Sequence, residues 1–323
     1  MKILANDGIA PEGVIALEKA GFTVVTEAVP QDKLIETINA EAYTGLVVRS
    51  ATTVRKDIID NCPSLKFIGR GGVGMDNIDV AYAREKGIVV ENTPAASSQS
   101  VAELVMGALF SISRSLHDSY KNMPVNGVDT FKVLKKKYGK GVELRGKTLV
   151  IVGFGRIGQS LASYALGVGM KVIAVDQNEY TVAIPVTLHG AGVINVELKT
   201  VTDLTAVLSE ADYISLHVPK QADGSAVITA KEFAVMKDGV RLVNAARGGV
   251  INEDDLLTAL ANGKVANVAL DVFENEPTPR KDLLEHELIA STPHIGAATV
   301  EAQGRIGEEL AEKIIATFKV AAK

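Results

Sequence analysis

The chain contains little cysteine and no long apolar run, and each shortage excludes a class of protein. Its single cysteine, Cys62, cannot build a framework of internal disulfides, which fits a reducing compartment. No apolar run reaches the roughly 18 residues that a membrane-spanning helix needs. The segment from Met1 to Asp7 predicts a strand rather than a signal peptide. We therefore expect a soluble, cytoplasmic protein without a membrane partner.

The chain also lacks a large excess of either charge. Its 34 Lys and Arg against 39 Asp and Glu give a net charge of −5, which offers no reason to expect a nucleic-acid partner. No histidines or cysteines have the spacing of a metal site, and neither a Walker loop nor a G-x-S-x-G elbow occurs. The 47% apolar content, 29 glycines and length of 323 residues instead suggest an α/β protein of two domains.

The most informative motif is a G-x-G-x-x-G made by Gly153, Gly155 and Gly158. It follows a β-branched and aliphatic strand predicted over 148–152. The first glycine permits a tight turn, the second lets the backbone approach a pyrophosphate, and the third lets helix pack on strand. A helix predicted over 160–166 would direct its N-terminal amides at that anion. Alone the glycine pattern is weak, because glycine-rich turns are common.

The residues that follow strengthen this interpretation. A second strand, predicted over 171–175, leads to Asp176. A carboxylate there accepts hydrogen bonds from an adenosine ribose and repels a 2′-phosphate, so it favours NAD over NADP. Arg156, inside the motif, is either a solvated surface residue or a phosphate contact, and its position favours the contact. Strand, glycines, helix, strand and acid in this order predict an NAD site.

Strands and helices alternate on both sides of this motif. Before it, strands are predicted at 2–5, 23–26, 46–48, 67–69 and 88–90, with helices at 11–20, 31–38, 54–61, 80–86 and 98–114. After it, strands are predicted at 193–196, 213–217, 241–244 and 266–270, with helices at 204–208, 231–236, 253–261 and 302–318. Such alternation is typical of parallel sheets with helices on both faces.

The predicted fold is therefore α/β, with two doubly wound parallel-sheet domains. We expect a flavodoxin-like substrate domain made of residues 1–97 together with 293–323. A Rossmann domain over 98–292 is inserted into it, and the helix at 302–318 returns to the first domain.

Three polar residues near strand ends are candidates for chemistry. Hydride transfer between a carbinol and nicotinamide needs a proton acceptor, a cation for the carboxylate and carbonyl, and a dry pocket. Ligands of doubly wound sheets bind beyond the carboxyl ends of strands, where Arg247, Glu276 and His294 are expected. A histidine oriented by a carboxylate suits reversible acid–base chemistry, and arginine can fork onto a carboxylate. Each alone has an ordinary explanation, as a surface arginine, a turn glutamate or a buried histidine.

At these residues the sequence resembles the D-isomer-specific 2-hydroxyacid dehydrogenases, over nearly the whole chain. The shared stretches are Val47–Thr52, Gly69–Asn77, Asn92–Pro94, Gly153–Gly158, Val243–Gly249, Leu270–Phe273 and Pro293–Ala297. A Rossmann domain inserted into a smaller flavodoxin-like domain is the architecture of that family. The resemblance further implies a homodimer joined through the Rossmann domains, and we expect no feedback through the C-terminal regulatory domain of the longer members.

The resemblance also implies roles for individual residues. His294 would take the proton from the C2 hydroxyl, Glu276 would orient it, and Arg247 would hold the carboxylate and the forming ketone. Cofactor contacts are implied at Val73, Gly153, Gly155, Arg156, Ile157, Gly158, Asp176, His217, Val218, Pro219, Ala245, Ala246, Asp271, Gly296 and Ala297. Substrate contacts are implied at Arg49, Ser50, Gly72, Val73, Ser97 and Arg247, with Arg49 and the cluster Lys135–Lys137 as candidates for a substrate phosphate.

Within the family the likeness is greatest to the enzymes that oxidise D-3-phosphoglycerate to 3-phosphohydroxypyruvate in serine biosynthesis, which is the reaction expected. Those enzymes usually carry an asparagine where this chain has Ser97. That difference leaves a hydroxypyruvate or glyoxylate reductase open as the alternative. A third alternative is an NAD-sensing binding protein, as the family's transcriptional corepressors are.

Overall fold

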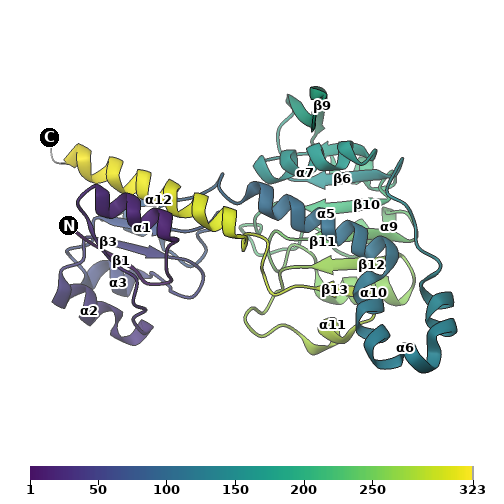
Figure 1. Cartoon of the computed structure of the whole chain (residues 1–323), viewed down its shortest axis with the longest axis horizontal. Helices are drawn as coiled ribbons and strands as arrows, with labels where there is room; N and C mark the ends of the chain where they lie inside the picture. Colours follow the sequence, from purple (N-terminus) through teal and green to yellow (C-terminus); the bar gives the residue numbers. More distant parts are fainter. Residues whose placement is uncertain (322–323) are drawn as a thin grey trace. The chain divides into compact units, whose positions relative to one another are not determined.

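The polypeptide forms two compact units, which the computed structural model describes over residues 1–321 (Figure 1). Unit 1 consists of Met1–Ser98 and Ala297–Lys323, and unit 2 of Gln99–Gly296. The chain thus leaves unit 2 after Gly296 rather than at the predicted residue 293, so His294 belongs to unit 2. No helix within the described residues is both long and apolar enough to cross a lipid bilayer.

Unit 1 contains a five-stranded parallel sheet in the order β2-β1-β3-β4-β5, the strand order of flavodoxin-like folds. Its strands are β1 (Lys2–Ala5), β2 (Thr23–Val25), β3 (Gly45–Val48), β4 (Phe67–Arg70) and β5 (Val89–Asn92). Its helices are α1 (Pro11–Lys19), η1 (Gln31–Lys33), α2 (Leu34–Glu41), α3 (Lys56–Asn61), α4 (Val80–Glu85) and α12 (Val300–Ala321). Helix α12 lies beside α1 although the two are far apart in sequence (Figure 1).

The apolar sequence of strand β3 fits its central position in this sheet. Strand β3 is buried at every residue, because it is a central strand covered by helices on both faces. Two apolar clusters form on the two faces, one containing Leu46 and Val48 and the other Val47. The carboxyl ends of the parallel strands meet at one edge, where Arg49 and Gly71–Gly72 follow β3 and β4.

Unit 2 contains an eight-stranded sheet in the order β13-β12-β11-β10-β6-β7-β9-β8. Its strands are β6 (Thr148–Val152), β7 (Lys171–Val175), β8 (Thr181–Leu188), β9 (Gly192–Val201), β10 (Tyr213–Leu216), β11 (Val240–Asn244), β12 (Val265–Leu270) and β13 (Ile289–Ser291). Its helices are α5 (Ser98–Arg114), α6 (Leu116–Tyr138), α7 (Arg156–Gly167), α8 (Leu204–Leu208), α9 (Ala230–Val235), α10 (Glu253–Ala261) and α11 (Lys281–Glu285). One apolar cluster joins α5 and α7 to the sheet, and another joins α8, α9 and α10 to its opposite face.

Several parts of unit 2 differ from the prediction, among them α11 and β13, which were not predicted. Strands β8 and β9 pair antiparallel, whereas a single strand at 193–196 in a parallel sheet was expected. Burial of Ile184 against the cluster that contains α7 holds this hairpin on the sheet edge. Helix α6 was not predicted at all; it contains Pro124 and a non-helical residue, Thr130, at which it bends. Figure 1 shows α6 extending from the body of unit 2.

Candidate active site

The turn between β6 and α7 is shaped for an anion. Gly153 has φ +91°, and a Cβ atom there would lie 2.5 Å from the carbonyl oxygen of His217, so this position requires glycine. Gly155 differs, because its φ is −73° and a Cβ atom there would meet no protein atom within 4 Å. The fold does not explain a glycine at 155, whereas close approach of a pyrophosphate does. Arg156 and Ile157 open α7, so their amides lack intrahelical partners.

Asp176 lies directly beside this turn, immediately after β7. Its Oδ2 accepts the N–H of Phe154 at 2.9 Å, and its Oδ1 accepts the N–H of Gln177 at 2.8 Å. Both carboxylate oxygens are thereby oriented, and each has lone-pair capacity left for a ribose hydroxyl. The residues of the turn therefore fit the diphosphate and ribose of NAD.

His217 closes the other side of the turn. Its N–H donates to the carbonyl of Val152 at 2.7 Å, and its Nε2 lies 2.8 Å from Oγ of Ser215. Burial lowers the pKa of the His217 imidazole to about 4, so the ring is neutral at physiological pH. The backbone of His217 packs against Gly153, so this histidine has a structural role. Val218 and Pro219 follow it at the strand end.

Glu276 and His294 form a hydrogen-bonded pair beyond β12 and β13, the two strands at the other edge of the sheet. Nδ1 of His294 lies 2.8 Å from Oε2 of Glu276, and Oε1 of Glu276 accepts the N–H of Phe273 at 3.0 Å. His294 has a φ of +54°, a left-handed conformation that non-glycine residues adopt rarely. Backbone strain of this kind is often found where a side chain must be aimed precisely for function. The arrangement can accept and return a proton at the second ring nitrogen.

Asp271 holds the segment that carries His294. Its Oδ1 accepts from Oγ1 of Thr292 at 2.6 Å and from the N–H of Ile295 at 2.8 Å, and its Oδ2 accepts the N–H of Gly296 at 2.9 Å. Asp271 is only 4% exposed. These three bonds flank His294 on both sides and fix the turn around it. Asp271 was predicted to line the nicotinamide, and its hydrogen bonds give it this holding role as well.

Arg247 lies on the loop after β11, and Asn244 fixes that loop. The side chain of Asn244 accepts the N–H of Ala246 at 3.1 Å and donates to the carbonyl of Arg247 at 3.0 Å. The Arg247 guanidinium donates to the carbonyl of Ala246 at 2.7 Å. The next residue is Gly248, where a Cβ atom would lie 1.7 Å from the carbonyl oxygen of Phe273, so only glycine fits. The Arg247 loop and the Glu276 loop are thus in direct contact.

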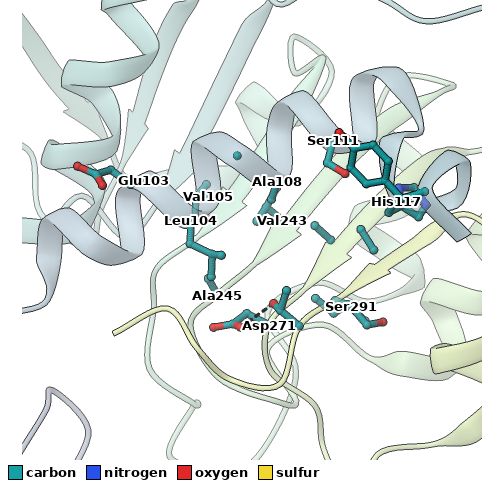
Figure 2. A pocket seen from close by; sticks show the side chains of 16 residues that line it. Glu103, Leu104, Val105, Ala108, Ser111, His117, Val243, Ala245, Asp271 and Ser291 are labelled. Carbon is teal, nitrogen blue, oxygen red and sulfur yellow. Dashed lines mark hydrogen bonds between the residues drawn. The ribbon is translucent and has the colours of Figure 1, made fainter. Parts of the chain in front are cut away.

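A mainly apolar cavity of about 430 Å³ lies between α5 and the ends of β11, β12 and β13 (Figure 2). Ala245 and Asp271 line one end of the cavity and His117 the other. Burial lowers the pKa of the His117 imidazole below its ordinary value. The cavity gives the region beside Ala245 and Asp271 an apolar wall, as a hydride transfer requires.

Unit 1 carries the predicted substrate residues at the carboxyl edge of its own sheet. The backbone N–H of Arg49 donates to Oδ2 of Asp7 at 2.6 Å, and the Arg49 side chain borders Gly71. Ser50 is exposed and Ser97 is buried. The backbone carbonyls of Gly72 and Val73 accept from Thr93 and Asn92, respectively.

Two further residues of unit 1 were missed in the sequence. The Arg70 guanidinium fills the space that a side chain at Gly72 would need, 1.7 Å from the position of its Cβ atom. Arg70 ends β4 inside a stretch already singled out, and this strand-end position was the available signal. Asp7, which anchors Arg49 from 42 residues away, gave no sequence signal. Lys137 of the lysine cluster is in unit 2 and pairs with Asp118 and Glu287.

Comparison with known proteins agrees with this geometry. Residues 106–296 match the family described as "D-isomer specific 2-hydroxyacid dehydrogenase, NAD binding domain". The chain belongs to the D-isomer-specific 2-hydroxyacid dehydrogenase family. It is 42% identical over 317 residues to a hydroxypyruvate reductase of Thermotoga maritima, covering 97% of each chain. It is 41% identical to the D-3-phosphoglycerate dehydrogenase of Methanocaldococcus jannaschii, of which it covers 57%, so it spans little more than half of that relative.

Solved structures of the family share the fold. A glyoxylate reductase from Paecilomyes thermophila superimposes with a TM-score of 0.80 at 30% identity, covering 97% of this chain and 93% of that one. The holo form of D-mandelate dehydrogenase from Rhodotorula graminis gives a TM-score of 0.84 at 25% identity, with the same coverage. The predicted family, α/β fold class, enzyme class and cofactor are thereby confirmed. The chain is an NAD-dependent 2-hydroxyacid dehydrogenase.

Proposed function

We propose that this dehydrogenase oxidises D-3-phosphoglycerate to 3-phosphohydroxypyruvate, the reaction that leads to serine biosynthesis. The observation that carries the proposal is the pair of guanidinium groups on unit 1. Arg49 follows β3 and Arg70 ends the adjacent strand β4, and both side chains border Gly71–Gly72. Two cations at the carboxyl edge of the sheet suit a substrate with a carboxylate and a phosphate, and exceed what an uncharged tail would need.

The catalytic groups of unit 2 divide the chemistry among themselves. Bound NAD supplies the acceptor for the hydride that leaves C2. His294 accepts the hydroxyl proton at its Nε2, because its Nδ1 is engaged by Glu276. Glu276 stabilises the positive charge that forms on the ring, and its own position is fixed by the N–H of Phe273. Arg247 binds the substrate carboxylate and stabilises the oxygen that becomes the carbonyl.

Hydroxypyruvate or glyoxylate reduction is the second candidate, and two observations favour it. Ser97 replaces the asparagine expected of the phosphoglycerate branch. The Thermotoga maritima hydroxypyruvate reductase also matches this chain over 97% of both lengths, whereas the phosphoglycerate dehydrogenases are longer. The catalytic set is the same for both substrates, so the choice depends on the unit 1 residues.

The deciding experiment follows NADH absorbance with 3-phosphohydroxypyruvate, hydroxypyruvate and glyoxylate in parallel. We expect kcat/KM to be highest for the phosphorylated ketoacid. Arg49→Ala should lower that value about tenfold or more while it changes hydroxypyruvate turnover much less, since one charge-assisted phosphate contact is lost. Equal or better turnover of hydroxypyruvate would overturn the proposal. If NADH bound but none of the three ketoacids reacted, an NAD-sensing role would replace it.

The enzyme is further proposed to act in the cytoplasm as a homodimer joined through unit 2. Helix α6 supports this, because it leaves several apolar side chains in solvent; Val125, Val128 and Phe131 are 77%, 96% and 55% exposed. Exposed apolar residues on one element often mark a subunit interface. Analytical ultracentrifugation should give twice the chain mass of 34.1 kDa, and Val128→Asp should shift the protein toward monomer. A monomeric wild-type protein at micromolar concentration would contradict the homodimer.

A further inference from the structure

Directly before the hairpin β8–β9, the side chain of Tyr180 reaches back to the glycine-rich turn. Oη of Tyr180 donates to the carbonyl of Phe154 at 2.7 Å and lies 3.4 Å from Oδ2 of Asp176. The backbone of Tyr180 is itself fixed by Thr200 of β9. Its N–H donates to Oγ1 of Thr200 at 2.9 Å, and its carbonyl accepts the N–H of Thr200 at 2.9 Å. The pairing of β8 with β9 therefore determines where the phenol lies.

Three side chains hold the peptide groups of Phe154, the residue between Gly153 and Gly155; one comes from α7 and two from the connection between β7 and β8. Asp176, directly after β7, accepts its N–H at 2.9 Å. Tyr180 donates to its carbonyl, and so does Nε2 of Gln159 in the first turn of α7, at 3.0 Å. The Phe154 side chain is completely buried. Side-chain hydrogen bonds thus hold both the N–H and the carbonyl of Phe154, in the turn that faces the pyrophosphate.

Such ties matter because of the flanking glycines. Glycine loses more conformational freedom on ordering than any other residue, so a glycine-rich turn that is free before binding weakens the affinity for its ligand. A turn already fixed by hydrogen bonds binds without that entropic cost. Burial and the neighbouring Asp176 carboxylate raise the pKa of the Tyr180 phenol, so it remains a protonated donor at physiological pH.

We infer that Tyr180 is a positioning residue of the cofactor site, and that the hairpin β8–β9 belongs functionally to that site. The phenol holds the glycine-rich turn and the Asp176 carboxylate in the arrangement that receives the NAD diphosphate and ribose. It acts through Phe154 and Asp176 and need not touch the cofactor. Its effect is therefore on cofactor affinity, with no effect on the proton-transfer residues Glu276 and His294.

The test compares Tyr180→Phe with the wild-type enzyme. The variant keeps the aromatic ring and removes the hydroxyl, so one hydrogen bond to Phe154 is lost. We expect KM and Kd for NADH to rise roughly five- to tenfold, as the loss of one hydrogen bond predicts. KM for the ketoacid at saturating NADH, and kcat, should stay within about twofold of wild type. Tyr164→Phe is the matched control, because that phenol bonds Glu103 at 2.7 Å on the same unit, away from the turn.

Gln159→Leu is the second variant and keeps the test decisive if Tyr180→Phe folds poorly. It removes the other donor to the Phe154 carbonyl and leaves the hairpin intact, so it should raise KM for NADH in the same way. The loss of NADH affinity in the double variant should differ from the sum of the two single losses, because both donors share one acceptor. Unchanged NADH affinity in folded Tyr180→Phe and Gln159→Leu, or an equal rise in KM for the ketoacid, would overturn the inference.

Discussion

Nδ1 of His294 lies 2.8 Å from Oε2 of Glu276, while the other oxygen of that carboxylate is held by the N–H of Phe273. A backbone amide thus fixes the glutamate, and the glutamate fixes the imidazole. The chain of contacts leaves the remaining ring nitrogen of His294 as the atom available for proton exchange. These contacts also predict how strongly turnover depends on Glu276 and on His294.

Replacing Glu276 should damage turnover without weakening cofactor binding. Glu276→Gln keeps the size of the side chain but removes the charge that supports a protonated imidazole. We expect kcat to fall about 100-fold, in the range seen for general acid–base residues, with an unchanged Kd for NADH. His294→Ala should cost at least as much, and adding Glu276→Gln to it should cost little more, because the two act as a unit. Independent, additive losses would separate Glu276 from the mechanism.

The Arg247 loop should tolerate no lysine. Arg247→Lys preserves the positive charge but cannot form two parallel hydrogen bonds to a carboxylate. We expect kcat/KM for the ketoacid to fall about 100-fold, while NADH titration by fluorescence gives the wild-type Kd. As a control, Arg241→Lys alters an arginine near the start of β11, at the opposite end of that strand from the Arg247 loop. A near-normal kcat/KM for Arg247→Lys would mean that its guanidinium fork does not bind the substrate.

Asp176 should determine the choice between the two nicotinamide cofactors. Asp176→Asn keeps an oxygen that can accept the N–H of Phe154, now made at 2.9 Å, but removes the negative charge. The wild-type enzyme should use NADH far better than NADPH, because the carboxylate repels a 2′-phosphate. The variant should narrow that preference about tenfold, measured as the ratio of kcat/KM values. Equal use of both cofactors by the wild-type enzyme would refute the assignment of Asp176.

Asp7 should position Arg49 for the substrate. Besides the N–H of Arg49, it accepts the N–H of Thr52 at 3.0 Å and its hydroxyl at 2.5 Å. Asp7→Asn loses one acceptor oxygen, so the loop that carries Arg49 should loosen and KM for the ketoacid should rise several-fold. Asp79→Asn, which affects the Arg55 contact elsewhere in unit 1, should leave KM unchanged. The same rise in both variants would indicate general destabilisation instead.

Much of this architecture could be predicted from the sequence because the pattern and the packing agree. Strands β6 and β7 and helices α5, α8 and α10 have the predicted bounds. The hairpin was missed because Pro185 interrupts β8, and proline is tolerated there only since β8 is the edge strand of the sheet. Helix α6 was missed because Pro124 and its largely exposed apolar residues conceal any core-facing period.

The sequence indicated the candidate catalytic residues but not the residues that position them. Arg247, Glu276 and His294 lie near strand ends in recognisable stretches, and all three belong to unit 2. The residues that hold the segments around His294, Arg49 and Phe154 in place could not be read from the sequence in the same way. Asp7, Asp271 and Tyr180 act through hydrogen bonds to backbone groups, most of them distant in the chain. Such contacts depend on tertiary packing, for which a single sequence contains no periodic signal.

The buried His217 should make stability depend on pH. Its folded-state pKa is about 4, below the value of about 6.5 for an unfolded histidine. Between these values the unfolded chain binds a proton that the native state does not, so this group favours unfolding as the pH falls from 6.5 toward 4. Above pH 6.5 it contributes no pH dependence. The slope from one such group approaches about 1.4 kcal/mol per pH unit.

His217→Asn removes this titration while keeping a side chain that can hydrogen-bond Ser215, now 2.8 Å from the imidazole. Urea unfolding at pH 7.5 and pH 5 should show a smaller loss of unfolding free energy for the variant than for the wild-type protein. Comparing the two proteins cancels the contributions of the carboxylates and of His117, which both retain. Parallel pH dependence in the two would mean that the His217 ring is protonated without unfolding, and that solvent reaches it beside Gly153 in the native enzyme.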